Sequence, residues 1–191
     1  MAKSIAEKRQ HFIDASTAFL AQKHNASLNE IADHIGVGRA TLQRYFPKRQ
    51  DLLRAIALDC VQKVDQVLKP LQTIEQSAEA GLRMFFDVLV PLGDAYHFLA
   101  TYPDVISFEE VAKDYGRQLN TLQRYVGYLK RENVLAIDIP DAWAVRMIDL
   151  LIWGAWSAVH AGSIARNDAA ELAFRSLVSG LGQRVVGEMD F

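Results

Sequence analysis

Cysteine is almost absent from this chain, because Cys60 is the only one in 191 residues. One thiol cannot form an intrachain disulfide, and it cannot supply the paired cysteines of a structural zinc site. The five histidines are scattered, and no His-Glu-x-x-His motif occurs among them. We therefore expect no metal ion, and the single thiol favours a reducing compartment, the cytoplasm.

Motifs that carry chemistry or hold cofactors are also missing. There is no Gly-x-Ser-x-Gly elbow, no Walker loop and no Gly-x-Gly-x-x-Gly turn. His97 or His160 could act in catalysis, but a histidine in apolar surroundings more often packs in a core or lines a pocket. We expect no catalytic residue and no cofactor, and a small helical enzyme is kept as an alternative.

Strand signals are equally scarce. The sequence has no sustained alternation of apolar and polar residues and no Asn-Gly or Asp-Gly turn, which predicts an all-α fold. The first ten residues are polar, so we expect no signal peptide. The longest uncharged helical run, Leu150 to Ala165, is short for a bilayer span and contains glycine, serine and histidine. We therefore expect no membrane partner.

What the sequence does contain is a pair of short helices between Ser27 and Asp51. The first has an apolar stripe at i, i+3, i+4 and i+7, formed by Leu28, Ile31, Ala32 and Ile35. Ser27 and Glu30 have the spacing of a capping box, and Gly36 suits the left-handed position that ends a helix. The second helix has an inward face at i and i+4, formed by Leu42 and Phe46.

The outward face of the second helix favours DNA. Its residues are donors and acceptors that suit base edges and phosphates, and none is acidic: Arg39, Ala40, Thr41, Gln43, Arg44 and Tyr45. Ala32 and Gly36 are small where two helices must cross closely, as in a helix-turn-helix. A generic helical hairpin with a solvated face is the alternative.

The charge distribution supports the DNA interpretation, although the whole chain has a net charge of −2. Residues 1–50 hold eight Lys or Arg and four Asp or Glu, an excess of +4. The remaining 13 basic and 19 acidic residues give residues 51–191 a charge of −6. A basic end joined to an acidic body is typical of a protein with one DNA-facing surface.

About fifty residues near the N-terminus resemble the DNA-binding domain of the TetR family of bacterial transcriptional regulators. The shared residues are Phe19-Leu20-Ala21, Ser27-Leu28, Ile31-Ala32, Gly36-Val37, Thr41-Leu42, Tyr45-Phe46-Pro47, the pair Lys48-Arg49 and Leu52-Leu53. The chain departs from the common pattern with His24-Asn25 after the first helix, Gly38 before the second short helix, and Gln43-Arg44. We expect base contacts from Arg39, Thr41 and Gln43, with Ala40 beside them. We expect phosphate contacts from Ser27, Asn29, Arg44, Tyr45, Lys48 and Arg49.

The rest of the chain predicts a helical body. We expect a DNA-binding domain over residues 1–50 and an effector-binding and dimerisation domain over 51–191, with the physical boundary inside a long helix that begins after Pro47. Further helices are expected over residues 5–23, 73–89, 94–101, 104–133, 141–163 and 168–187. The helix over 141–163 is apolar nearly all round, so it should be buried on every side, with help from a second subunit.

The resemblance implies a homodimer through the last two helices and a small effector bound in the body. Our candidates for effector contact are Phe86, Tyr115, Arg117, Trp143 and Met147, which suit an apolar or aromatic molecule with a polar end. The expected function is that of a repressor on a palindromic DNA operator, released by its effector. The alternatives are a DNA-binding protein without an effector and, more remotely, a body that binds another protein.

Overall fold

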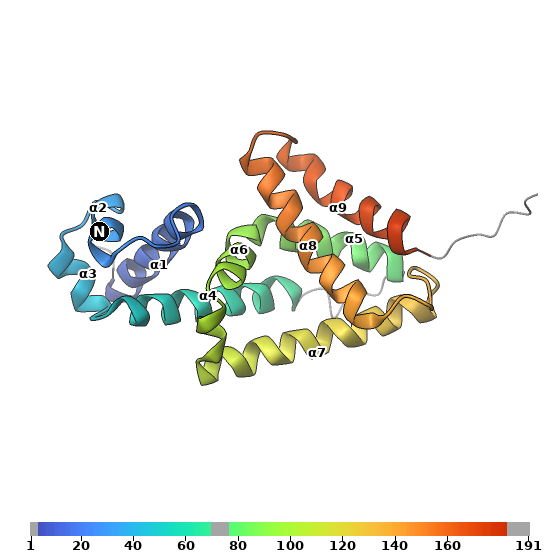
Figure 1. Cartoon of the computed structure of the whole chain (residues 1–191), viewed down its shortest axis with the longest axis horizontal. Coiled ribbons are helices and arrows are strands. Elements are labelled where there is room, and N and C mark those ends of the chain that lie inside the picture. The colour runs from blue at the N-terminus through green and yellow to red at the C-terminus, as the bar shows by residue number, and fades with distance from the viewer. Residues whose placement is uncertain (1–3, 70–76, 183–191) are drawn as a thin grey trace, which may run out of the picture. The chain divides into compact units, whose positions relative to one another are not determined.

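The computed structural model describes residues 4–69 and 77–182, and within them every regular element is a helix. The all-α fold class is confirmed (Figure 1). The helices fall into two compact units. Unit 1 comprises residues 1–64 and 94–115, and unit 2 comprises residues 65–93 and 116–191.

Unit 1 begins with three helices, α1 (Ile5–Gln22), α2 (Leu28–His34) and α3 (Arg39–Tyr45). Ser27 caps α2 by accepting from the Glu30 amide, and the Glu30 carboxylate accepts from the Ser27 amide at 2.8 Å, so the expected capping box is confirmed. Gly36 has φ of +72°, as its predicted role at the end of a helix requires. Ile5, the first residue of α1, is 77% exposed.

Three further segments complete unit 1. The first is α4 (Arg49–Leu68), which belongs to unit 1 as far as Val64. The second is α6 (Gly93–Thr101), from Asp94 onward, together with η3 (Pro103–Ser107). The third is the first turns of α7 (Glu109–Arg131). One core unites these segments with α1–α3, and it contains Leu42, Phe46, Ile56, Phe98 and Val111. Contacts thus divide the chain inside α4 and add 94–115 to unit 1. The functional division at residue 50 stays a prediction.

Unit 2 holds α5 (Ala78–Leu89), η2 (Val90–Leu92), most of α7, α8 (Asp141–His160) and α9 (Arg166–Leu181). Its buried side chains include Leu82, Phe86, Leu129, Ile148 and Phe174. Gly93, the first residue of α6, belongs to unit 2 and lies against Trp156, because a Cβ on this residue would come within 2.1 Å of the tryptophan side chain.

Several predicted boundaries need correction. The expected helix over 104–133 begins only at Glu109, because Phe108 is extended with ψ of 127° and a 3-10 turn precedes it. The helix expected over 73–89 is described from Ala78, after the Ser77 cap, and its earlier part lies outside the described residues. The last helix ends at Leu181, and residues 183–187 of that prediction are likewise outside the described range.

The single chain covers only part of α8, and its burial on every side with help from a second subunit stays a prediction. Ala144, Ile148, Ile152 and other small or aliphatic residues are buried, but Trp143 is 52% and Leu150 49% exposed. Among the described residues, α8 is the one helix long and apolar enough to cross a bilayer, with a mean hydropathy of 1.2. The core helix of a soluble protein can meet the same test, so this finding is weak evidence for a membrane span.

Candidate nucleic-acid interface

The α2–α3 pair has the helix-turn-helix arrangement that the sequence predicts. Its turn is closed by the Val37 amide, which donates to the Ala32 carbonyl at 3.0 Å. Leu42 is fully buried and Phe46 is 1% exposed, so both inward positions of the second helix are confirmed. The Tyr45 ring meets Phe12 edge-on at 5.1 Å between centroids, which places one side of α3 against α1.

The opposite face of α3 is open and free of acids. Arg39, Ala40 and Arg44 are exposed, whereas Thr41 and Gln43 are half-buried. No Asp or Glu occurs between Asp33 and Asp51. A phosphate or a base acceptor near this face would therefore meet no carboxylate from α3 or its flanking residues.

The start of α2 presents the first predicted phosphate contacts, Ser27 and Asn29, which are both exposed. The hydroxyl oxygen of Ser27 is used as a cap, and that bond leaves its hydrogen able to donate. Glu30 lies one turn inward, and its bonds with Lys23 at 2.6 Å and with Ser27 lower its pKa to about 2. The negative charge beside the phosphate candidates is therefore neutralised locally by Lys23.

The start of α4 carries the basic pair Lys48-Arg49, to which the sequence assigns phosphate contacts. The Asp51 carboxylate accepts from the Lys48 amide at 2.8 Å, and the Arg49 guanidinium donates to the carbonyls of His24 at 2.8 Å and Ala26 at 2.9 Å. Lys48 is exposed. Both phosphate assignments stay predictions, but the Arg49 guanidinium also binds the backbone of the α1–α2 loop.

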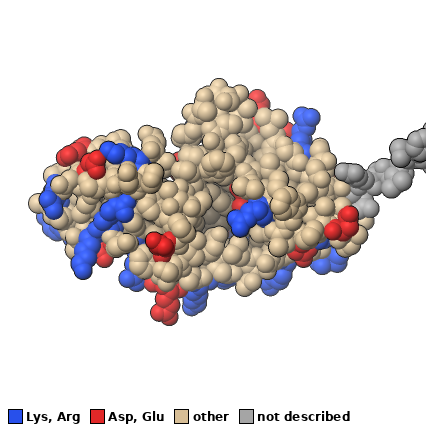
Figure 2. Space-filling model, in the orientation of Figure 1, with Lys and Arg blue, Asp and Glu red and all other residues tan. Residues whose placement is uncertain are grey.

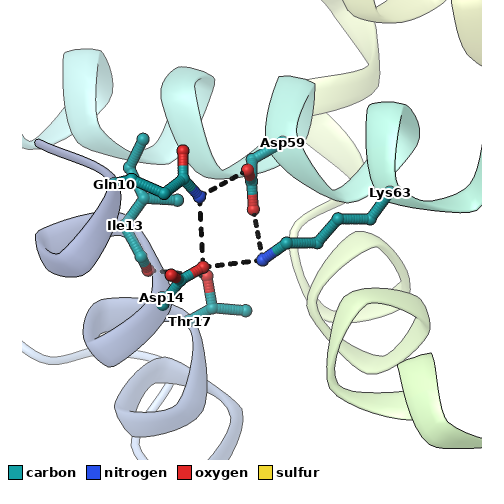
Figure 3. Close-up of polar contacts among 6 residues, drawn as sticks. All are labelled: Gln10, Ile13, Asp14, Thr17, Asp59 and Lys63. Carbon is teal, nitrogen blue, oxygen red and sulfur yellow. Dashed lines mark hydrogen bonds and ion pairs between the residues drawn. The ribbon is translucent and has the colours of Figure 1, made fainter. Parts of the chain in front are cut away.

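A network of side chains fastens α1 to α4 (Figure 3). The Gln10 amide donates to Asp14 at 3.1 Å and to Asp59 at 2.7 Å, and Lys63 lies 2.7 Å from a carboxylate oxygen of each acid. Burial lowers the pKa of Lys63, but its bonds to the two carboxylates raise it further, so the net change is upward. We call these four residues the α1–α4 bracket. No local sequence pattern indicates this network, because its contacts between the two helices join residues 49 positions apart.

The basic side chains of unit 1 are visible in the space-filling view (Figure 2). Lys and Arg side chains project from the end formed by α1–α3, with some acidic side chains beside them. The excess of +4 over residues 1–50 is therefore carried at least partly on the surface of these helices.

Comparisons with known proteins agree with this geometry. The family model described as "Bacterial regulatory proteins, tetR family" matches residues 12–56, which span α1 to the first turns of α4. Residues 12–56 therefore form a DNA-binding domain of the TetR family. The recognition made from the sequence is confirmed, and the protein is a TetR-family transcriptional regulator.

Two relatives extend the match to nearly the whole chain. The HTH-type transcriptional repressor LfrR of Mycolicibacterium smegmatis is 29% identical over 91% of this chain and 89% of its own length. The crystal structure of LfrR in complex with proflavine has a TM-score of 0.74 and 28% identity, over 92% of this chain and 98% of that chain. A TetR-family regulator from Marinobacter aquaeolei VT8 shares the fold, with a TM-score of 0.68 and 21% identity over 93% of this chain and 96% of its own.

For a TetR-family regulator the second site of interest is the effector site, and the structure does not bring all five candidates together. Tyr115 packs on the core of unit 1, whereas the other four belong to unit 2. Phe86 is fully buried, Met147 half-buried and Trp143 largely exposed. Arg117 pairs with Asp65 at 2.5 Å. Effector contact by these residues stays a prediction.

Two polar residues of unit 2 were overlooked in the sequence. Burial raises the pKa of Asp149 on α8 to about 6, and Arg146 offsets this only partly. Burial also raises the pKa of Tyr125, whose ring lies 5.9 Å from that of Phe85. An acid within the most apolar helix was the available signal for Asp149, because such a group is costly to bury.

Proposed function

We propose that this protein is a repressor that binds a palindromic DNA operator as a homodimer and is released by a small apolar or aromatic effector. The observation that carries the proposal is the shape of α3. Its apolar side is locked into the core by Leu42 and Phe46, and its other side exposes Arg39 and Arg44 without an acid nearby. Such a helix can enter a major groove as a rigid body.

The residues of this face divide by role. Arg39, Thr41 and Gln43 are proposed to contact base edges, with Ala40 lying closely over them. Arginine can donate two hydrogen bonds to a guanine, at roughly 1–3 kcal/mol for a good pair. Ser27, Asn29, Arg44, Tyr45, Lys48 and Arg49 are proposed for the phosphate backbone, which fixes the register of α3.

The homodimer is proposed from unit 2. Exposed apolar side chains recur on the two long helices near the end of the chain, with Trp143 and Leu150 on α8 and Leu172, at 41%, on α9. A twofold axis would pair these faces with the same faces of a second copy, as in a four-helix bundle. Two copies of α3 could then read half-sites about 34–36 Å apart.

The effector and the direction of control are proposed from the relatives. LfrR is named a repressor, and its crystal structure is a complex with proflavine. Unit 2 of this chain has aromatic rings on α5 and α7. Unit 2 also contains four of the candidates for effector contact, Phe86, Arg117, Trp143 and Met147, and the fifth, Tyr115, belongs to unit 1. An effector acts by binding more tightly to the state that fits DNA poorly. We place the protein in the cytoplasm.

Selection of duplexes from random DNA by the purified protein tests the proposal. A palindromic consensus bound by a dimer is expected, and proflavine should then lower the affinity for that duplex. Failure to enrich any sequence at low ionic strength would reject the function. Binding to DNA that is unaffected by proflavine and by related aromatic compounds would favour the alternative, a DNA-binding protein without an effector.

A further inference from the structure

A second set of contacts within unit 1 connects α6 and η3 to the loop between α1 and α2. The His97 Nε2 atom on α6 lies 3.0 Å from the carbonyl oxygen of Ala21, in the last turn of α1. The Tyr102 hydroxyl, just before η3, donates to the carbonyl of His24. Arg49 reaches the same loop at His24 and Ala26. We call His97, Tyr102 and Arg49 the loop clamp.

The chemistry of the clamp is well matched to a helix end. The last carbonyls of a helix have no partner within it, so donors from elsewhere must satisfy them. A carbonyl can only accept, so His97 must hold its proton on Nε2 for this bond. Burial raises the pKa of Tyr102, against the effect of Arg49, and its hydroxyl therefore stays protonated as a donor.

The clamp residues also support one another. The Arg49 guanidinium lies 5.7 Å from the centre of the Tyr102 ring, and that ring lies 4.7 Å from Phe98, a fully buried core residue. Ala26 is completely buried, so its carbonyl belongs to a segment that cannot shift without disturbing the core. The loop is therefore held by its backbone, from two different stretches of the chain.

The position of this loop bears directly on DNA binding. Ala26 precedes Ser27, the cap of α2, and the predicted phosphate contacts Ser27 and Asn29 follow at once. A shift of the loop would move these contacts together with the start of α2. The chain departs from the resembled family's pattern at His24-Asn25, and the His24 carbonyl accepts hydrogen bonds from both Arg49 and Tyr102.

We propose that Tyr102 and His97 are positioning residues for DNA binding, which act by holding the α1–α2 loop so that Ser27 and Asn29 meet the phosphate backbone. This inference rests on the proposed function. Residues outside 1–50, on α6 and at the start of η3, would then contribute to the affinity for DNA through the α1–α2 loop. The affinity falls by the fraction of molecules in which the loop is displaced.

The test uses the full-length protein and the duplex that the wild-type protein selects from random DNA. Tyr102→Phe removes the donating hydroxyl and keeps the ring on Phe98. Tyr128→Phe, which removes a hydroxyl from unit 2, is the matched control. Fluorescence anisotropy at several salt concentrations gives the affinity and its salt dependence, and thermal unfolding reports the folded fraction.

We expect Tyr102→Phe to weaken binding roughly 5- to 10-fold, the scale of one lost hydrogen bond, and to flatten the salt dependence by about one phosphate contact. The fully folded fraction at the assay temperature should not change, and Tyr128→Phe should bind as the wild type does. A structural role alone would not alter the salt slope of a fully folded protein.

His97 gives an independent arm. Glutamine can place an amide donor near the position of Nε2, whereas leucine cannot, so His97→Gln should retain most of the affinity that His97→Leu loses. Amide hydrogen exchange at residues 24–30 should be faster in Tyr102→Phe and in His97→Leu than in the wild type. It should be unchanged in Tyr128→Phe. Wild-type affinity and salt slope in both variants would overturn the clamp and leave the proposed function standing. Wild-type protein that selects no duplex would overturn both.

Discussion

The two units of the molecule differ in how completely each one covers its own apolar surface. Six large apolar side chains are exposed within the described residues, and five of them lie in unit 2: Ile137, Trp143, Leu150, Trp153 and Leu172. In unit 1 only Ile5, at the start of α1, is exposed to that degree. Within the described residues, unit 1 thus covers nearly all of its large apolar side chains, whereas unit 2 leaves several of them exposed.

Their polar contacts differ in the same direction. In unit 1, side chains from α4 and α6 reach the backbone and side chains of α1 through the α1–α4 bracket and the loop clamp. In unit 2, the half-buried Asp149 lies within the apolar helix α8, and its partial burial raises the pKa of its carboxyl group. The first arrangement joins separate helices of unit 1 through polar contacts, whereas the second leaves a carboxyl group in apolar surroundings.

The largest effect should come from a charged side chain placed on the exposed apolar face of unit 2. Leu150→Asp would place a carboxylate where the proposed dimer buries a leucine, so the protein should become monomeric. The affinity for the operator should fall about 10²- to 10⁴-fold. A monomer binds a single half-site and loses the gain in affinity that a dimer obtains from binding two linked half-sites. Sedimentation and anisotropy measure the two changes. Asn120→Asp, on an exposed site of α7, adds the same charge as a control, and a dimeric Leu150→Asp variant would contradict the proposed interface.

Asp149→Asn should produce the next largest effect, on stability. The folded pKa of about 6 exceeds the ordinary value of 3.8, so the folded state binds the proton more tightly and stability falls as pH rises between these values. At about 1.4 kcal/mol per pKa unit, the ionised group costs at most about 3 kcal/mol. The variant should therefore be more stable than the wild type at pH 7.5 and similar at pH 4. Urea unfolding at both pH values is the measurement, and a pH-independent difference would contradict the burial of the charge.

Arg39→Ala should weaken binding to the selected duplex by about 1–3 kcal/mol and relax the preference at one base pair of each half-site. Lys48→Ala is the matched comparison, because the loss of a phosphate contact lowers the affinity for all sequences alike and reduces the salt slope. Repeating the selection with each variant separates the two roles. An unchanged consensus and affinity for Arg39→Ala would remove it from the base-reading residues.

The sequence predicts unit 1 better than unit 2, and the reason is the range of the contacts. The capping box at Ser27 and Glu30, the turn at Gly36 and the inward pair Leu42 and Phe46 all act within a few residues, so local patterns reveal them. The bracket, the loop clamp and the task of Arg49 depend on residues 23 to 78 positions apart, which no local pattern encodes.

In unit 2, too, local sequence patterns leave long-range contacts unpredicted. The periodicity of α8 reports how apolar the helix is, but it cannot say whether the chain itself or another molecule covers each face. The break at Phe108 was missed for a similar reason. Glu109, Glu110 and Ala112 after it favour a helix, whereas the 3-10 turn before it contains the buried Val105.

The smallest expected effect concerns the α1–α4 bracket and is best measured as a double-mutant cycle. Lys63 is 36% and Asp14 50% exposed, so the coupling between Asp14→Asn and Lys63→Met should be about 0.5–1 kcal/mol in the free energy of unfolding. Lys63→Met alone should cost more than Asp14→Asn alone, because it also leaves the 14%-exposed Asp59 without its cation.

A parallel cycle on Arg83 and Glu171 in unit 2 sharpens the comparison between the units. This pair is similarly exposed, at 42% and 44%, so its coupling energy should be of similar size. Only the bracket cycle should also change the affinity for the selected duplex, because only the bracket holds a helix of the DNA-binding unit. Equal effects of both cycles on DNA affinity would show that the bracket stabilises the fold without fixing the angle of α1 on α4.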